Sequence, residues 1–189
     1  LKIVHSVMQF HPHTVQMRTS TALGPVRLAA SPAGLVGVWF EGQRHEPSQR
    51  LHGPTAWADT ASHPVLEEAA HQLQQYFAGQ RAGFDLPLDL SGGTPFQQAV
   101  WRALLAIGRG ATTSYGALSR QLGRPLAVRA VGAAVGRNPI SVVVPCHRVV
   151  GSDGSLTGYA GGLDRKAVLL TLENALPSTS PNAFRKGHA

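Results

Sequence analysis

The chain has 189 residues, of which 43% are hydrophobic and 14% are charged. This length and composition exclude wholesale disorder and collagen-like repeats, and they allow one sizeable domain or two small ones with a buried core. The 17 Lys and Arg residues outnumber the 10 Asp and Glu residues, which gives a net charge of +7 at pH 7. This excess of positive charge favours an anionic partner such as nucleic acid.

Cysteine usage indicates a reducing compartment. Cys146 is the single cysteine of the sequence, so neither an intrachain disulfide nor a zinc site with two or more thiolates can form.

No stretch approaches the roughly 20 apolar residues needed to cross a bilayer, and residues 1–10 lack the pattern of an export signal. We therefore expect a cytoplasmic protein with no membrane partner.

The first half is expected to be a small sheet-and-helix domain. Residues 1–16 form a polar, unpatterned stretch that we expect to be an N-terminal extension. From residue 15 to 41 apolar runs alternate with turn residues, which predicts a β-meander. Residues 65–77 carry apolar side chains at helical spacing, and residues 84–90 read as a short strand or an extended crossover. The N-terminal α/β domain is thus expected over residues 17–90.

The second half is expected to be mainly helical. Residues 91–93 read as a linker, residues 94–174 as a C-terminal domain, and residues 175–189 as a flexible tail. The whole chain is therefore expected to be a mixed α/β (α+β) protein, with a sheet domain followed by a helical one.

Capping residues set the expected helices of this second domain. Thr94, followed by a proline, begins a helix that is expected to end at Gly108. Ser114 caps a second helix over residues 115–122, and a Gly-containing turn leads to a third helix over residues 126–136. Two helices joined in this way have the spacing of a DNA-binding helix-turn-helix.

Charge placement supports a nucleic-acid partner for this region. No acidic residue occurs between Asp89 and Asp153, and seven arginines do: Arg102, Arg109, Arg120, Arg124, Arg129, Arg137 and Arg148. Such a segment attracts phosphate. The helix over residues 126–136 is also rich in Ala and Gly, which suits either tight packing on a neighbouring helix or close entry into a DNA groove with Arg129 as the one long side chain.

The surroundings of Cys146 suggest a reactive thiol. A β-branched run at residues 140–144 predicts a buried extended segment, with the cysteine at its end. A buried, inert cysteine is one interpretation, but His147 and Arg148 supply a base and a positive charge that could activate the thiol. Because adjacent residues of a strand point to opposite faces, either the chain turns here or a water links the thiol to the imidazole.

An imidazole that acts as a base needs an acceptor to fix its tautomer. Only Asp153, Asp164 and Glu173 follow Asp89 in the sequence. Glu173 lies at the end of a segment with a buried helical pattern, so it is the best candidate partner for His147; an ordinary solvated glutamate is the alternative.

Short motifs on both sides of Cys146 point to one family. Residues 144–150 read Val-Pro-Cys-His-Arg-Val-Val, Asn138-Pro139 precedes them, and residues 158–162 read Gly-Tyr-Ala-Gly-Gly. Together with Arg-Ala-Val-Gly at residues 129–132, this pattern resembles the active-site region of O6-alkylguanine-DNA alkyltransferases. The resemblance extends over roughly residues 21–173.

The resemblance implies repair of alkylated DNA by direct reversal. Cys146 would take an alkyl group irreversibly, and only once, from O6 of guanine and also from O4 of thymine, after the base is flipped out of the duplex. His147 would be its base through a water, and Glu173 would orient His147. Asn138 would shape the site, and Tyr115 would donate a hydrogen bond to the purine.

The resemblance also implies a DNA surface and a base pocket. Arg129 would enter the duplex where the nucleotide has been flipped out. The other expected DNA-binding residues are Ala127, Ala130, Gly132, Ala133, Arg148 and Ser114, and the expected base pocket is formed by Val149, Tyr159, Ala160 and Arg148.

The implied partner is double-stranded DNA that contains O6-alkylguanine. We expect no cofactor, no metal, no obligate protein partner and a monomer, with cooperative assembly along DNA left open.

Two positions depart from the family pattern, since Gly108 stands where Pro is common and Ala160 where Ser or Gly is common. The alternatives are a non-catalytic protein that binds alkylation damage, in which the acceptor cysteine is replaced, and a Cys-His-Glu hydrolase or acyltransferase.

Overall fold

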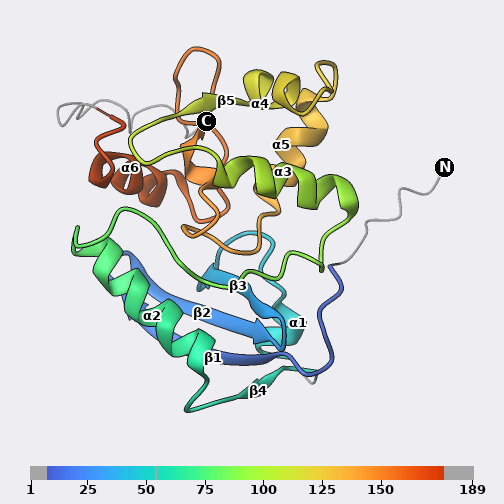
Figure 1. The fold of residues 1–189 in the computed structure, drawn as a ribbon, viewed down its shortest axis with the longest axis vertical. Coiled ribbons are helices and arrows are strands. Elements are labelled where there is room, and N and C mark those ends of the chain that lie inside the picture. The colour runs from blue at the N-terminus through green and yellow to red at the C-terminus, as the bar shows by residue number, and fades with distance from the viewer. Residues whose placement is uncertain (1–7, 54, 177–189) are drawn as a thin grey trace.

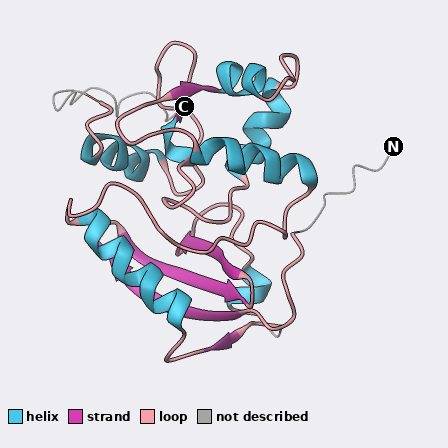
Figure 2. Cartoon of the chain, viewed as in Figure 1, coloured by secondary structure: helices cyan, strands magenta, loops and turns pink. Residues whose placement is uncertain are grey.

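The computed structural model describes residues 8–53 and 55–176, which form a sheet part and a helical part packed against each other (Figure 1). The sheet has four strands in the order β3-β2-β1-β4. One long helix, α2, lies across the sheet (Figure 2). The elements of this part are β1 (Val15–Thr21), β2 (Gly24–Ser31), β3 (Gly34–Phe40), α1 (Ser48–Leu51), β4 (Ala58–Asp59) and α2 (Pro64–Phe77).

The sheet confirms the predicted meander. Strands β1, β2 and β3 pair antiparallel in chain order, and β4 joins β1 in parallel. Strand β1 begins at Val15, two residues before the expected start of the domain. Helix α2 has Pro at its first position and buries Leu66, Leu73 and Tyr76 against the strands, as the helical spacing predicts.

The outer edge of β3 is covered at two points, although this strand is the last one of the sheet. Leu35 pairs with Leu88 of the crossover from the first domain, and Val38 pairs with Ile140 of the second domain. The Val38 amide donates to Pro139 O at 2.9 Å, and the Ser141 amide donates to Val38 O at 3.0 Å. The sheet edge therefore supports the turn that follows the third helix of the C-terminal part.

The helical part contains the expected helices with one shorter boundary. Thr94 and Gln97 form a capping box at the start of α3, and Ser114 caps α4. Helix α3 ends at Leu105 instead of Gly108, because the amides of Ala106 and Ile107 bond three residues back and tighten the last turn. The elements are α3 (Pro95–Leu105), β5 (Thr113–Ser114), α4 (Tyr115–Gln121), α5 (Val128–Gly136), the 3-10 helix η1 (Cys146–Arg148), β6 (Val149–Val150) and α6 (Leu163–Leu172).

Helices α4 and α5 form the expected helical pair, and α3 packs against α5 from below (Figure 1). The fully buried Trp101 fixes this contact, since its indole Nε1 donates to Ala134 O at 2.8 Å. Across residues 8–53 and 55–176, no helix has both the length and the apolar character required for a membrane span.

The predicted extended segment at residues 140–144 is wrong in conformation, although it is buried as expected. The chain turns here, and Val142 has a φ of 73°, which is strained for a β-branched residue. The Asn138 side chain overrides the strand preference, because its Oδ1 accepts from the Ile140 amide at 3.0 Å and its Nδ2 donates to Val144 O at 2.8 Å. Cys146 consequently begins a 3-10 helix and does not end a strand.

Candidate active site

The Cys146 thiol is buried and faces the side chain that holds the turn. Its side chain is only 4% exposed, and Asn138 Nδ2 donates to Cys146 Sγ at 3.1 Å. Burial raises the pKa of Cys146, while the Asn138 hydrogen bond and the positive charge of Lys166 act in the opposite direction. The same amide thus shapes the loop and stabilises negative charge on the sulfur.

His147 and Glu173 form the predicted contact. His147 Nε2 lies 2.9 Å from Glu173 Oε1, and both side chains are buried. Within residues 8–53 and 55–176, the other ring nitrogen, Nδ1, is buried without a hydrogen-bond partner. An ionised carboxylate can only accept a hydrogen bond, so Nε2 must carry the N–H that points at Glu173. In the neutral imidazole this leaves Nδ1 without a proton and able to accept one.

Electrostatics around this pair keep the imidazole neutral and the carboxylate charged. Burial lowers the pKa of His147, and the attraction of Glu173 offsets only part of this effect. Burial alone would raise the pKa of Glu173, but hydrogen bonds from His147, Arg148 and Tyr76 hold it well below the usual range. A neutral histidine oriented by a carboxylate is the form required of a general base.

Arg148 occupies a different place from the one expected. Its guanidinium is buried and donates to both carboxylate oxygens of Glu173, at 2.8 and 2.9 Å, and also to Ile107 O. These bonds hold the buried side chain on Glu173 and Ile107, whereas a contact with DNA or with a bound base was expected. Its position next to His147 in a basic segment suggested a phosphate contact, but the 3-10 turn directs it toward Glu173.

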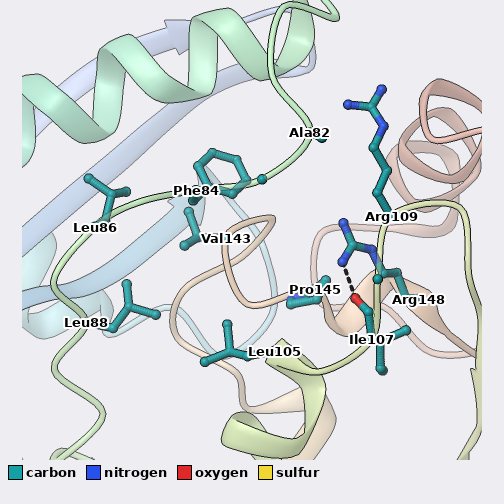
Figure 3. Close-up of a pocket in the computed structure, with 12 residues that line it drawn as sticks. Ala82, Phe84, Leu86, Leu88, Leu105, Ile107, Arg109, Val143, Pro145 and Arg148 are labelled. Atoms are coloured by element: carbon teal, nitrogen blue, oxygen red, sulfur yellow. Dashed lines mark hydrogen bonds between the residues drawn. The ribbon is translucent and has the colours of Figure 1, made fainter.

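A cavity of about 280 Å³ lies behind this cluster, between the crossover at residues 82–88 and the chain that follows α3 (Figure 3). Arg148 borders the cavity, and the bond from its guanidinium to Ile107 O is drawn there. Phe84 and Val143 meet at one wall, next to Pro145. The cavity belongs to the seam between the two parts of the chain.

Two tyrosines that were expected at the site, Tyr115 and Tyr159, lie at the start of α4 and on the chain between β6 and α6. Tyr115, at the start of α4, donates its hydroxyl to Thr157 O or Gly158 O, at 3.1 and 3.2 Å. Tyr159 is buried edge-on to His147, with ring centroids 6.5 Å apart. Burial raises the pKa of both tyrosines, and the Cys146 thiol raises them further. The two phenols therefore lie within electrostatic reach of the sulfur.

Loop 157–160 and strand β6 carry the other residues that were expected to contact the base. Ala160 is half-buried and its carbonyl accepts from the Arg44 amide at 3.0 Å. Val149 is fully buried in β6, which pairs with β5 immediately before Tyr115. Gly158 has a φ of 51°, and a Cβ there would lie 3.2 Å from the Tyr115 hydroxyl. The glycine allows the close approach of the loop to Tyr115.

Helix α5 presents a face of small residues next to Tyr115. Arg129, Ala130 and Ala133 are exposed, while Ala127 is half-buried. A Cβ at Gly132 would lie 3.7 Å from the Tyr115 ring. Helix α5 packs on α3 and α4 with one face and leaves the other bare, so packing on neighbouring helices accounts for only part of the small residues. Ser114 caps α4 through a bond from the Ala117 amide at 3.1 Å.

Three residues of interest were not singled out from the sequence. Tyr76 on α2 donates its hydroxyl to Glu173 Oε1, although 97 positions separate the two residues. Lys166 on α6 is fully buried, and its Nζ donates to backbone carbonyls beside the site. Leu126 is 100% exposed just before α5. For Lys166, its position among apolar residues at helical spacing was the one sequence feature that could have indicated burial.

Family models match most of the chain. Residues 17–90 match the ribonuclease-like domain of 6-O-methylguanine DNA methyltransferase, and residues 95–175 match its DNA binding domain. A methylated-DNA--protein-cysteine methyltransferase of Mycobacterium bovis is 48% identical over 153 residues, which are 81% of this chain and 88% of the relative. One from Methanosarcina acetivorans is 44% identical over 153 residues, which are 81% of this chain and 94% of the relative.

Solved structures agree with these matches. Mycobacterium tuberculosis OGT in complex with DNA is 43% identical, with a TM-score of 0.75 over 85% of this chain and 93% of that one. The O6-methylguanine-DNA methyltransferase of Pyrococcus kodakaraensis is 25% identical, with a TM-score of 0.57 over 85% of this chain and 98% of that one. By sequence and by fold, this chain belongs to the O6-methylguanine-DNA methyltransferase family.

Proposed function

We propose that this protein repairs DNA by moving an alkyl group from O6 of guanine onto Cys146. The observation that carries the proposal is the arrangement around the thiol. Asn138 donates to the sulfur at 3.1 Å, and the adjacent imidazole is held at 2.9 Å by a buried, ionised Glu173 with its second nitrogen free. Membership of the family supplies the substrate class.

The reaction balances with the groups present. The Sγ–H proton passes through a water to His147 Nδ1, and the thiolate attacks the alkyl carbon that is bonded to O6. The S–C bond forms, the C–O6 bond breaks, and its electron pair leaves with the guanine. The guanine then takes up, through water, the proton that His147 received, so the imidazole is neutral again and the step balances. The product thioether is not readily cleaved by water or by a thiol, so each protein molecule is expected to act once.

The proposed partner is double-stranded DNA, bound through α5. Arg102, Arg120, Arg124 and Arg129 are all exposed in the acid-free segment, which suits contacts with phosphate. The OGT of Mycobacterium tuberculosis has been crystallised in complex with DNA. The bare face of α5 suits close approach to a groove, and Arg129 suits the position left by a flipped nucleotide.

The proposed pocket for the flipped base lies between β6 and loop 157–160. Tyr115 would turn its hydroxyl from the loop carbonyls toward the purine, and Val149 and Tyr159 would contact the base. Ala160 lacks a hydroxyl, so only its backbone N–H could assist the leaving O6 atom. Alkyl transfer from O4 of thymine is proposed through the same thiol.

Stoichiometry tests the proposal. A duplex with one O6-methylguanine is mixed with the protein at several ratios, and the lesion that remains is quantified. We expect repair to stop when one lesion per protein has been removed, and Cys146→Ser to remove none while still binding the duplex. Repeated turnover, or repair by the Cys146→Ser variant, would refute the proposal.

A further inference from the structure

A glutamine of the sheet part reaches the turn that leads to the reactive cysteine. Gln43 follows β3 and is buried, with 6% of its surface exposed. Its Oε1 accepts two hydrogen bonds, from the Phe40 amide at 2.9 Å and from the Ser141 hydroxyl at 3.3 Å. The first bond fixes the glutamine to its own strand. The second joins it to a residue 98 positions further along the chain, so this side chain connects the two parts of the molecule.

The turn that receives this bond has a strained backbone. Val142 has a φ of 73°, and a β-branched residue keeps such a conformation only where the surrounding contacts impose it. Asn138 holds the turn from within, through bonds to its backbone. From outside, the backbone of Val38 bonds to Pro139 and Ser141 at 2.9 and 3.0 Å. The Gln43 bridge adds a side-chain contact from the sheet part to these backbone bonds.

The geometry of this turn determines where the thiol lies. The Val143 amide donates to Ser141 O at 2.9 Å, and the Cys146 amide donates to Val144 O at 2.8 Å. Asn138 Nδ2 donates both to Val144 O and to Cys146 Sγ, at 2.8 and 3.1 Å. A displacement of the turn at Ser141 would therefore change the position of the sulfur relative to the amide that donates to it.

The bridging hydroxyl has no access to solvent that could replace its partner. Ser141 is only 1% exposed. Loss of the Gln43 acceptor would leave a buried hydroxyl unpaired, and such a group destabilises the conformation that buries it. The bridge is therefore expected to hold the turn in the conformation that the structure shows.

The same segment of the sheet part also contacts the loop that carries Tyr159. The Arg44 amide donates to Ala160 O at 3.0 Å. A Cβ at Gly161 would lie 3.1 Å from the Phe40 ring, so the loop packs closely on the end of β3. Residues 43 and 44 thus contact both the turn before the acceptor cysteine and the loop that follows β6.

We propose that Gln43 is a positioning residue: by accepting from Ser141 it holds the turn that places Cys146 Sγ at the Asn138 amide, and it thereby supports alkyl transfer. The holding of the turn concerns the structure alone. The effect on transfer rests on the proposed function. A methionine could fill the same volume as Gln43, but it has no oxygen to accept from the two donors.

Three variants separate the hydrogen bonds from the volume of the side chain. Gln43→Met keeps the length and removes the acceptor, whereas Gln43→Glu keeps an acceptor oxygen for both donors. Ser141→Ala removes the donor and leaves the Phe40 bond in place, so it tests the bridge even if Gln43→Met does not fold. Gln49→Met replaces an exposed glutamine of α1 and is the matched control.

Hydrogen exchange of backbone amides tests the holding of the turn without DNA or substrate. The amides of Ser141, Val144 and Cys146 are hydrogen-bonded in or beside the turn. Relative to the amides of α2, we expect their exchange to be about tenfold faster in Gln43→Met and about threefold faster in Ser141→Ala. Gln43→Glu and Gln49→Met are expected to follow the unmodified protein. Equal acceleration in α2 and the turn, or none in the turn, would overturn the proposal.

Single-turnover transfer from the free base O6-methylguanine tests the effect on the reaction. A merely structural role would lower the number of active molecules, and so the methyl groups taken up per protein, without changing the rate constant. We expect Gln43→Met to lower the limiting rate about three- to tenfold, with unchanged uptake and half-saturating concentration. Gln43→Glu is expected to restore the rate to within about twofold.

Two results would contradict the positioning role: lower uptake at an unchanged rate constant, or a Gln43→Glu variant as slow as Gln43→Met. If the unmodified protein itself took up no methyl group, the proposed function would be refuted, and hydrogen exchange would still decide whether Gln43 holds the turn.

Discussion

Tyr76 on α2 donates its hydroxyl to Oε1 of Glu173, the same oxygen that lies 2.9 Å from His147 Nε2. Tyr76 belongs to the sheet part and Glu173 caps the last helix of the helical part. The N-terminal part is thereby connected to the imidazole through a single carboxylate. Arg109 adds to this junction, since its guanidinium lies 5.6 Å from the Tyr76 ring and donates to Leu172 O at 2.9 Å.

Tyr76→Phe is expected to slow alkyl transfer about three- to tenfold and to reduce the free energy of unfolding by about 1–2 kcal/mol, because one buried hydrogen bond to a charged group is lost. Transfer rates and denaturant unfolding measure the two effects. Phe84→Leu is the control, because it changes packing beside the Tyr76 ring, 5.0 Å away, and leaves the hydroxyl bond. If Tyr76→Phe transfers the alkyl group at the original rate, the hydrogen bonds from His147 and Arg148 are enough to hold Glu173, and the Tyr76 hydroxyl has no role in transfer.

Stability is expected to fall in acid through His147. Burial lowers the pKa of His147 in the folded state, so below the ordinary value of about 6.5 the unfolded chain binds the proton more readily. The free energy of unfolding therefore decreases as the pH falls from about 6.5 toward the folded pKa. Denaturant titrations at several pH values should show a weaker decrease for His147→Gln. Equal slopes in both proteins would argue against a neutral buried imidazole.

Glu173 contributes at lower pH. Its pKa is held below the usual range by its hydrogen bonds, so its stabilising effect is complete above about pH 4.3 and is lost as the pH falls toward the folded pKa. Glu173→Gln is expected to remove this second decrease and to destabilise the protein at pH 7, because Arg148 is left buried without a carboxylate. A variant as stable as the original at pH 7 would contradict this reading of the cluster.

Arg129→Ala is expected to weaken duplex binding about tenfold, which corresponds to roughly 1.4 kcal/mol. It should slow transfer from duplex DNA more than transfer from the free base, because the side chain is proposed to act only on the duplex. Fluorescence anisotropy and single-turnover rates measure the two effects, and the matched control is Arg50→Ala, which removes an exposed arginine on α1 of the sheet part. Equal slowing on both substrates would exclude the proposed insertion.

Leu126 lies in the turn before α5, between two exposed arginines, and is itself 100% exposed. An apolar side chain at this place suits contact with base edges or sugars in a groove. We expect Leu126→Ala to weaken duplex binding about three- to tenfold without changing its salt dependence, since no charge is lost. Leu163→Ala, on α6 and 44% exposed, is the control; the same loss from both variants would refute the contact.

Local signals predicted much of the fold. The capping residues Thr94 and Ser114 begin their helices as expected, and the helical spacing of residues 65–77 corresponds to α2. The contact between His147 and Glu173 was also predicted from the few acidic residues available. The helix boundaries depend on residues close together in the sequence, and the Glu173 assignment depended on there being only three acidic residues after Asp89. Both can be read from the sequence alone.

Other features depend on contacts that no local pattern encodes. Residues 140–144 favour a strand, but the Asn138 amide imposes a turn on them. Arg148 was grouped with the DNA-facing arginines because the charge pattern does not show which side chains turn inward. Tyr76 and Lys166 reach the site only through the packing of α2 and α6, so their roles required the structure.

The most direct test of the central claim is mass spectrometry of the intact protein and its peptides after reaction with a duplex that contains one O6-methylguanine. The proposed function predicts one added methyl group per protein at saturation, located on Cys146, and no addition to the Cys146→Ser variant. A protein that holds the damaged duplex but gains no methyl group, or gains it at another residue, would contradict the claim that Cys146 is the alkyl acceptor.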